Sequence, residues 1–256
     1  MNSGFGYWAG PKPRILAHRG LVTEDSPVEN TLESFAAALE AGADIIETDI
    51  QASKDGVAIV FHDADLSRLA GRPESVTDFD YAQLAEIELL GGGRISSLEA
   101  VLMAFPAAKF NLDVKSAAAI SAVAEVVNRL GCNDRVLITS FSEARRSKTL
   151  ALLPLKTASS ASAALLIAIY VLIALGLSFF VPVCSKRVKA LQVPTKAGFL
   201  RLDRSRFIRA VHRSGIEIHF WTINEAEEMK RLVSLGADGI VTDRADLAVK
   251  TLRKVS

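Results

Sequence analysis

Short apolar runs with strand character recur along this chain, and most of them are separated by stretches long enough for a helix. Strands separated by helices pair in parallel through right-handed crossovers. We therefore predict an α/β fold, a TIM-type (β/α)8 barrel with an unusually apolar helix after the sixth strand. The expected strands lie at residues 14–17, 44–50, 57–61, 110–114, 136–139, 155–158, 190–193, 216–221 and 239–242.

An eight-stranded barrel has no place for one of these expected strands. The surplus strand is either 190–193 or one member of the pair 44–50 and 57–61. Lys54-Asp55-Gly56 lies within that pair and is a tight-turn signal, which would make its two strands antiparallel. The sequence leaves this choice open.

Capping signals mark the ends of expected helices. Asn30 and Glu33 have the spacing of a capping box at the start of a helix over residues 30–41, and Gly42 is placed to end that helix. Ser96 with Glu99 predicts the start of another capped helix. Helices are thus expected where a barrel needs its crossovers.

With 256 residues, half of them hydrophobic, the chain fits one large barrel domain as well as two small ones. Because no repeat, low-complexity stretch or Pro/Gly-rich linker marks a boundary, we expect a single domain over residues 1–256. The formal net charge of +1 excludes a nucleic-acid binder driven by bulk charge. Cys132 and Cys184 have no metal-ligand spacing and are interpreted as reduced thiols. Residues 1–13 lack a basic region followed by an apolar run, so we expect no cleaved secretory signal and a cytoplasmic localisation.

Charged and histidine side chains follow the ends of several expected strands. They are His18, Arg19, Glu47, Asp49, His62, Asp113 and Lys115. Barrels of this type collect their chemistry at the C-terminal ends of their strands, so we expect these side chains to meet in space.

The carboxylates in this set predict a metal site. Residues two apart in a strand face the same side, so Glu47 and Asp49 can hold one ion together, and Asp113 can add a third carboxylate from another strand. Carboxylate oxygens are preferred by hard divalent cations such as Mg²⁺ and Ca²⁺. The alternative is that these acidic residues only solvate a strand end.

The histidines and cations suit the cleavage of a phosphodiester. His18 and His62 have the ordinary pKa range needed for proton transfer near neutral pH. Arg19 and Lys115 can hold phosphate oxygens. A structural role remains the alternative for a single strand-end histidine. Of the other two histidines, His212 is expected to be solvated in a basic helix, and His219, on one strand face with Trp221, is expected to pack.

Taken in chain order, a series of short motifs resembles the glycerophosphodiester phosphodiesterase family over residues 15–244. The motifs are Ala17-His18-Arg19-Gly20, Glu29-Asn30-Thr31, Lys54-Asp55-Gly56, His62-Asp63, Ser97-Leu98-Glu99, residues 111–115, Trp221-Thr222-Ile223-Asn224 and Thr242-Asp243-Arg244. The resemblance implies a metal-dependent barrel that hydrolyses glycerophosphodiesters to glycerol 3-phosphate and an alcohol.

The resemblance also implies a role for each matching residue. His18 and His62 would be the general acid and base, and Trp221 would be a wall of the substrate pocket. Arg19 and Lys115 would contact the phosphate. The ligands of a divalent ion, Mg²⁺ or Ca²⁺, would be Glu47, Asp49 and Asp113.

The chain departs from the family pattern at a few positions. The family usually has Glu where this chain has Asp113, so the carboxylate arm is one methylene shorter. Val28 interrupts the usual Pro-Glu-Asn-Thr, and Arg68-Leu69-Ala70 stands where Arg-Thr-Thr is usual. Two alternatives therefore remain beside the main hypothesis. They are a lysophospholipase D-like enzyme at a membrane surface and a catalytically decayed, membrane-associated binding barrel, which Asp113 favours.

Residues 163–183 carry no charge and would form a helix about 30 Å long, enough to cross a bilayer. A crossing would put the motif-bearing strands on opposite sides of the membrane, so we predict that the segment does not span. Its outer side must then be covered by a membrane surface, by a second copy of the chain, or by the chain's own loops. Basic residues on both flanks favour lipid.

Overall fold

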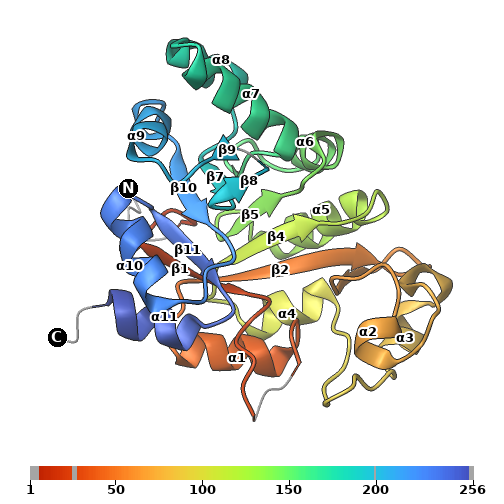
Figure 1. Cartoon of the computed structure of the whole chain (residues 1–256). Coiled ribbons are helices and arrows are strands. Elements are labelled where there is room, and N and C mark those ends of the chain that lie inside the picture. The colour runs from red at the N-terminus through yellow and green to blue at the C-terminus, as the bar shows by residue number, and fades with distance from the viewer. Residues whose placement is uncertain (1–5, 25–27, 199, 254–256) are drawn as a thin grey trace.

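A computed structural model describes residues 6–24, 28–198 and 200–253. Within these ranges, eight parallel strands form a nearly closed barrel surrounded by helices, so the predicted TIM-type fold is confirmed (Figure 1). In their spatial order the barrel strands are β6 (Ala158–Ser159), β5 (Val136–Thr139), β4 (Phe110–Val114), β2 (Ile45–Ala52), β1 (Arg14–His18), β11 (Gly239–Thr242), β10 (Glu217–Phe220) and β7 (Ala190–Val193).

The barrel closes between β6 and β7 through only a short parallel contact. Ser160 and Ala190 form an isolated bridge. The amide of Ala161 donates to the carbonyl of Ala190 at 3.0 Å, and the amide of Lys189 donates to the carbonyl of Ser159 at 3.0 Å. The strands on both sides of the apolar segment therefore belong to one barrel.

The surplus strand is β3 (Ala58–Val60), which pairs antiparallel with β2 and lies off the barrel path. The tight turn at residues 54–56 explains this pairing, because Gly56 has a φ of +80° that favours glycine. The suspicion that residues 190–193 are surplus was wrong, since β7 pairs in parallel with β10.

Helices of the outer ring follow most barrel strands. Their bounds are α1 (Leu32–Glu40), α4 (Leu98–Ala104), α5 (Ala119–Leu130), α6 (Glu143–Ala151), α7 (Ala163–Ala174), α9 (Ser205–Arg213), α10 (Ala226–Leu235) and α11 (Ala245–Leu252). The start of α1 differs from the prediction. Thr31 is the N-cap and forms a capping box with Ser34, whereas Asn30 has a φ of +58° and turns its side chain toward the barrel strands.

Several short elements are additions that the sequence did not predict. Beside β3, the elements α2 (Ser67–Ala70), η1 (Val76–Asp78) and α3 (Tyr81–Leu84) surround a small separate hydrophobic cluster. A two-stranded hairpin of β8 (Lys196–Ala197) and β9 (Leu200–Arg201) follows β7.

The apolar segment is not the single long helix that its composition suggests. The helix α7 has 12 residues, and Gly176 follows it with a φ of +76°. The 3-10 helix η2 (Ser178–Phe180) and the short helix α8 (Val181–Cys184) complete the segment. Among the residues described, none of the helices combines the length and the apolar character that crossing a bilayer requires.

Strand alternation decides which side chains face the barrel interior. Leu16, Ile45, Leu137 and Val241 pack together in one buried cluster inside the barrel. Their strand neighbours belong to the larger core between strands and helices; Ile15 and Ile46 are examples. Residues two or four positions after the interior ones therefore project toward the C-terminal mouth of the barrel.

Candidate active site

A cavity of about 550 Å³ opens at the C-terminal ends of the barrel strands. All eight side chains that the sequence predicted for the site line this cavity. They are His18, Arg19, Glu47, Asp49, His62, Asp113, Lys115 and Trp221. Residues from strands and loops far apart in sequence are thus brought together as expected for a barrel.

The three carboxylates come from neighbouring strands. In the sheet register Asp49 of β2 lies opposite Asp113 of β4, and Glu47 lies opposite Asn111. Glu47 also lies opposite His18 of β1. These side chains share the interior face because each follows the alternation set by Leu16, Ile45 and their neighbours.

Asp49 is fully compensated by positive and polar partners. Its Oδ1 lies 2.9 Å from Lys115 Nζ, and its Oδ2 lies 3.0 Å from Arg19 Nε. Asn30 Nδ2 donates to the same Oδ2 at 3.2 Å, and Thr48 Oγ1 in turn donates to Asn30. Burial alone would raise the pKa of Asp49, but Lys115 and Arg19 outweigh it and hold the pKa below its ordinary value.

Glu47 and Asp113 are poorly compensated by comparison. Both are buried, and Glu47 Oε2 and Asp113 Oδ1 have no hydrogen-bond partner within the described parts of the chain. Burial, together with the nearby charge of Asp49, raises the pKa of Glu47 to about 8. Burial also raises the pKa of Asp113, although Lys115 Nζ lies 2.8 Å from its Oδ2.

These oxygens suit a hard cation. No set of three or more His, Cys, Asp or Glu side chains converges with metal-ligand spacing among the residues described, and the Lys115 ammonium lies between Asp49 and Asp113. Yet Glu47 Oε2, Asp113 Oδ1 and Asn111 Oδ1 are all buried acceptors that meet no donor in the described part of the chain. Acceptor oxygens left unpaired in a buried site are costly unless a positive group meets them.

The ring of His18 is held by a carboxylate on one side. Its Nδ1 lies 2.7 Å from Asp243 Oδ1, and its Nε2 lies 4.0 Å from Glu47 Oε2. Asn224 Nδ2 donates to Asp243 at 2.7 Å and fixes that carboxylate. Burial lowers the pKa of His18, but Asp243 and Glu47 outweigh it and raise the pKa above its ordinary value.

His62 is held by a carboxylate in the same way. Its Nδ1 lies 2.6 Å from Asp63 Oδ1, and Arg68 Nε donates to the second oxygen of Asp63 at 2.7 Å. Arg68 also contacts Glu29 at 2.6 Å, and Glu29 accepts from Arg19 Nη1 at 3.0 Å. A chain of ion pairs therefore links the His62 side of the cavity to Arg19.

Reasoning from the sequence missed the partners of the histidines. Asp243, Asn224, Asp63 and Glu29 all stand in the motifs quoted above, but only the contacts assign them to His18, His62 and Arg19. The role of Gly20, which follows Arg19, was missed as well. A Cβ at this position would clash with Ser34 in α1, so only glycine lets the chain pass so close to this helix.

One side of the cavity is apolar. Trp221 lies edge to face against Phe141 with 6.0 Å between ring centroids, and Lys115 Nζ lies 5.9 Å from the Phe141 centroid. Leu166 and Ile167 of α7 continue this wall. The cavity therefore combines a charged side with an apolar side.

The two remaining histidines lie outside the cavity lining. His219 is fully buried, with Nε2 3.1 Å from Glu217, which agrees with the predicted packing role. His212 is exposed on α9, as expected for a solvated position, and its ring also pairs with Asp238 at 2.7 Å.

Comparisons with known proteins agree with this geometry. The model of the "Glycerophosphoryl diester phosphodiesterase family" matches residues 18–247. A "Probable glycerophosphodiester phosphodiesterase 2" of Mycobacterium tuberculosis is 35% identical over 91% of this chain and 88% of its own length. Lysophospholipase D GDPD3 of Mus musculus is 29% identical over 90% of this chain and 79% of its own length.

A solved structure with a bound product has the same fold. It is an Oleispira antarctica phosphodiesterase in complex with the product sn-glycerol-3-phosphate, with a TM-score of 0.76 and 22% identity. The match covers 95% of this chain and 98% of that one. At this identity the likeness supports the barrel fold alone.

Proposed function

Because the chain belongs to the glycerophosphoryl diester phosphodiesterase family, and is thus a phosphodiester hydrolase, we propose that it cleaves glycerophosphodiesters to glycerol 3-phosphate and an alcohol, as a single barrel domain. The observation that carries the proposal is the cavity at the strand ends. It combines two carboxylate-held imidazoles, His18 and His62, with two cations and buried unpaired carboxylate oxygens.

His18 and His62 are the proposed general acid and base. Asp243 and Asp63 each occupy the Nδ1 side of one ring, which fixes its orientation and leaves Nε2 for proton transfer. One imidazole takes a proton from the attacking water as its oxygen bonds to phosphorus. The other gives a proton to the leaving alkoxide as the phosphorus–oxygen bond to the alcohol breaks.

Arg19 and Lys115 are the proposed contacts for the phosphate, and Trp221 is the proposed wall for the rest of the substrate. Both cations already lie against Asp49, at 3.0 Å and 2.9 Å. That carboxylate therefore positions two positive charges at the cavity, where they offset charge that develops on the phosphoryl oxygens.

Glu47, Asp49 and Asp113 would hold a divalent ion, Mg²⁺ or Ca²⁺. When bound, such an ion would polarise a phosphoryl oxygen and offset its negative charge. The support comes from the chain itself, since Glu47 Oε2 and Asp113 Oδ1 are buried acceptors that meet no donor among the described residues. The shorter arm of Asp113 is expected to make its contribution to this site weaker than that of a glutamate.

Release of glycerol 3-phosphate from glycerophosphocholine by the purified protein tests the proposal. We expect turnover that stops when divalent ions are chelated and returns when Mg²⁺ or Ca²⁺ is added. Turnover that is unaffected by chelation would remove the role given to Glu47, Asp49 and Asp113. Absence of turnover with all ions would favour a decayed barrel that only binds.

A second candidate is a lysophospholipase D-like activity, which the apolar side of the cavity favours. Trp221, Leu166 and Ile167 offer surface that an acyl chain would cover and a deacylated substrate would not. The Mus musculus relative is named for this activity, as lysophospholipase D GDPD3. Turnover of lysophosphatidylcholine in preference to glycerophosphocholine would establish it, and the reverse preference would exclude it.

A further inference from the structure

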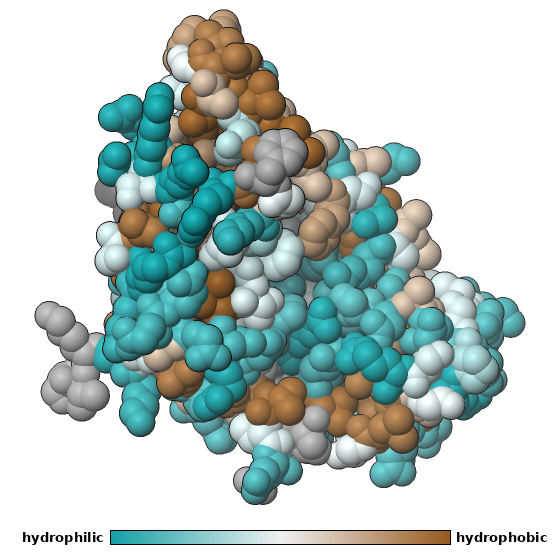
Figure 2. Space-filling model, in the orientation of Figure 1, coloured by the Kyte–Doolittle hydropathy of each residue, from teal (hydrophilic) through white to brown (hydrophobic). Residues whose placement is uncertain are grey.

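The segment of α7, η2 and α8, residues 163–184, forms an apolar arm at the edge of the barrel. The arm carries large apolar side chains that are 46–68% exposed: Ile167, Val171, Leu175, Phe179, Phe180 and Val183. Brown surface gathers over α7 and α8 at the top of Figure 2, where these helices extend beyond the barrel in Figure 1. Exposed apolar surface of this kind usually marks an interaction site.

One side of the arm is anchored to the barrel. Ile169 is fully buried, and the ring of Tyr170 lies 5.5 Å from the ring of Phe207 in α9. The exposed side is a stripe, because Ile167 and Val171 of α7 and Leu175 at its C-cap recur every fourth residue. The arm is thus held in place with one apolar face toward solvent.

This stripe is continuous with the active-site cavity. Ala163 and Ile167 are exposed at the start of α7, and both also line the cavity. A partner that covers the stripe would therefore reach the mouth of the cavity.

The surroundings of the arm are strongly basic. Residues 144–202 contain nine Lys or Arg and no Asp or Glu. Lys186, Lys189 and Lys196 are exposed and make no ion pair with any described residue. Beside the arm, α9 adds three exposed arginines, Arg206, Arg209 and Arg213. Teal surface lies over α9 next to the brown arm in Figure 2.

An apolar stripe can bind a second copy of the chain or a lipid bilayer, and the positive charge around the arm decides between these two partners. A symmetric dimer through the arm would bring the same cation-rich segments of two copies together, and they would repel. An anionic bilayer would neutralise them while the stripe enters the interface between headgroups and acyl chains. We propose that the arm and α9 form a docking surface for an anionic lipid bilayer.

Binding to vesicles tests this proposal without any turnover, so its failure is distinct from failure of the proposed hydrolysis. The full chain is floated with vesicles of phosphatidylcholine, with and without phosphatidylglycerol. We expect binding that requires phosphatidylglycerol and weakens as salt is raised. No binding to the anionic vesicles would overturn the proposal.

Apolar variants test the stripe. Leu175→Ser combined with Phe179→Ser is expected to weaken binding to anionic vesicles by roughly tenfold or more. Leu90→Ser with Met103→Ser is the matched control, because these side chains are 61% and 63% exposed but lie outside the arm. Equal losses from the two pairs would contradict a role of the arm.

Charge variants test α9 and remain informative if the apolar variants fail to fold. Arg206→Gln and Arg209→Gln are each expected to weaken binding to anionic vesicles roughly fivefold. The control is Lys54→Gln with Lys250→Gln, two exposed positions outside the arm and α9. Sedimentation measures the oligomeric state of the same variants. If the unchanged protein is a dimer that the arm variants abolish, and it does not bind vesicles, the surface joins two copies and the lipid proposal is wrong.

Discussion

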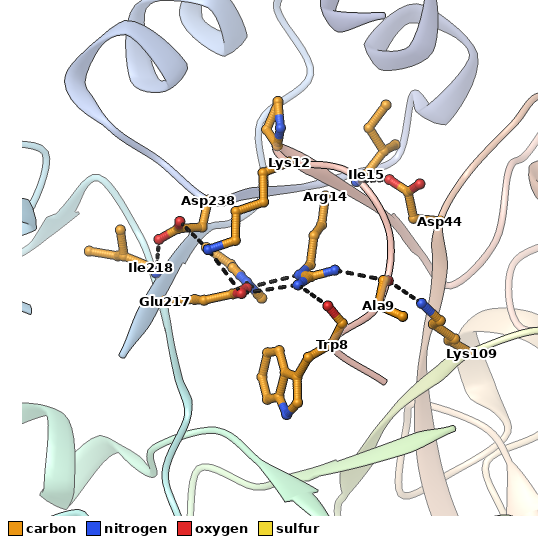
Figure 3. Close-up of polar contacts among 12 residues, drawn as sticks. Trp8, Ala9, Lys12, Arg14, Ile15, Asp44, Lys109, Glu217, Ile218 and Asp238 are labelled. Atoms are coloured by element: carbon orange, nitrogen blue, oxygen red, sulfur yellow. Dashed lines mark hydrogen bonds and ion pairs between the residues drawn. The ribbon is translucent and has the colours of Figure 1, made fainter. Parts of the chain in front are cut away.

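The two ends of the barrel both bury charged side chains, but they balance those charges differently. At the N-terminal end, Arg14 Nε and Nη2 contact the two oxygens of Glu217 at 2.9 Å and 3.0 Å, and Lys12 Nζ lies 3.0 Å from Glu217 and 2.8 Å from Asp238 (Figure 3). At the C-terminal end, Glu47 and Asp113 each keep a buried oxygen without a partner among the described residues.

The paired end also fixes the segment that precedes β1. Arg14 Nη2 donates to the carbonyl of Trp8 at 2.7 Å, and Lys109 donates to the carbonyl of Ala9 (Figure 3). The segment thus covers the bottom of the barrel. Charges that are fully paired in this way stabilise one conformation, whereas unpaired acceptors lower stability and leave a place for a ligand. The difference agrees with the proposal that the C-terminal end carries the reaction, while the N-terminal end stabilises the fold.

The largest expected effect is on catalysis at the C-terminal end. Replacing His18 or His62 with Ala should lower kcat by roughly 10²- to 10⁴-fold, because each variant lacks one of the two proposed proton-transfer groups. Thermal melting should change little. His212→Gln is the control, since this histidine contacts Asp238 outside the cavity. Equal losses of kcat in all three variants would contradict the proposal that His18 and His62 act in catalysis while His212 does not.

At the N-terminal end the large effect should be on stability. Glu217→Gln leaves Arg14 without its charged partner and should lower the free energy of unfolding by about 2–4 kcal/mol, while kcat of the folded protein is kept. Glu227→Gln, in a surface ion pair with Lys230, should cost under about 1 kcal/mol. Denaturation in urea measures both. A Glu217→Gln variant as stable as the Glu227→Gln one would contradict the role of the paired end.

Acid should weaken the paired end. Burial alone would raise the pKa of Glu217, but His219, Arg14 and Lys12 outweigh it and lower the pKa below its ordinary value of 4.5. A lowered carboxyl pKa contributes stability above the unfolded value, and that stability is lost as the pH falls below it. Melting curves should therefore show a smaller acid loss in Glu217→Gln than in the unchanged protein. Identical acid profiles would be the contrary result.

The smallest effect should be a gain of stability at the C-terminal end. Glu47→Gln removes a buried carboxyl whose pKa is raised to about 8, so the metal-free variant should be more stable by on the order of 1 kcal/mol. Turnover should be lost in the same variant. A loss of stability here would mean that Glu47 is a structural charge like Glu217.

The sequence predicted which side chains line the cavity because strand alternation is a local property. Glu47 and Asp49 are two residues apart, so their shared face follows from the strand alone. The assignment of Asp243 to His18, and of Glu29 to Arg19 and Arg68, depends on contacts between distant segments. No local pattern contains that information.

The same limit explains the errors in the fold. Asn30 and Glu33 have the spacing of a capping box, but Asn30 bonds to Thr48 and Asp49 of the neighbouring strand β2, and Thr31 caps the helix instead. In the apolar arm, uniform hydropathy concealed the end of α7, which a residue of positive φ, Gly176, marks in the structure.

Anomalous diffraction from crystals grown with Mn²⁺ and glycerol 3-phosphate tests the central claim most directly, since Mn²⁺ accepts the oxygen ligands that Mg²⁺ prefers. The account predicts an ion bounded by Glu47, Asp49 and Asp113, with the phosphate against Arg19 and Lys115, and no ion at Glu217 and Asp238. An empty carboxylate site at saturating Mn²⁺, or an ion at the opposite end of the barrel, would contradict it.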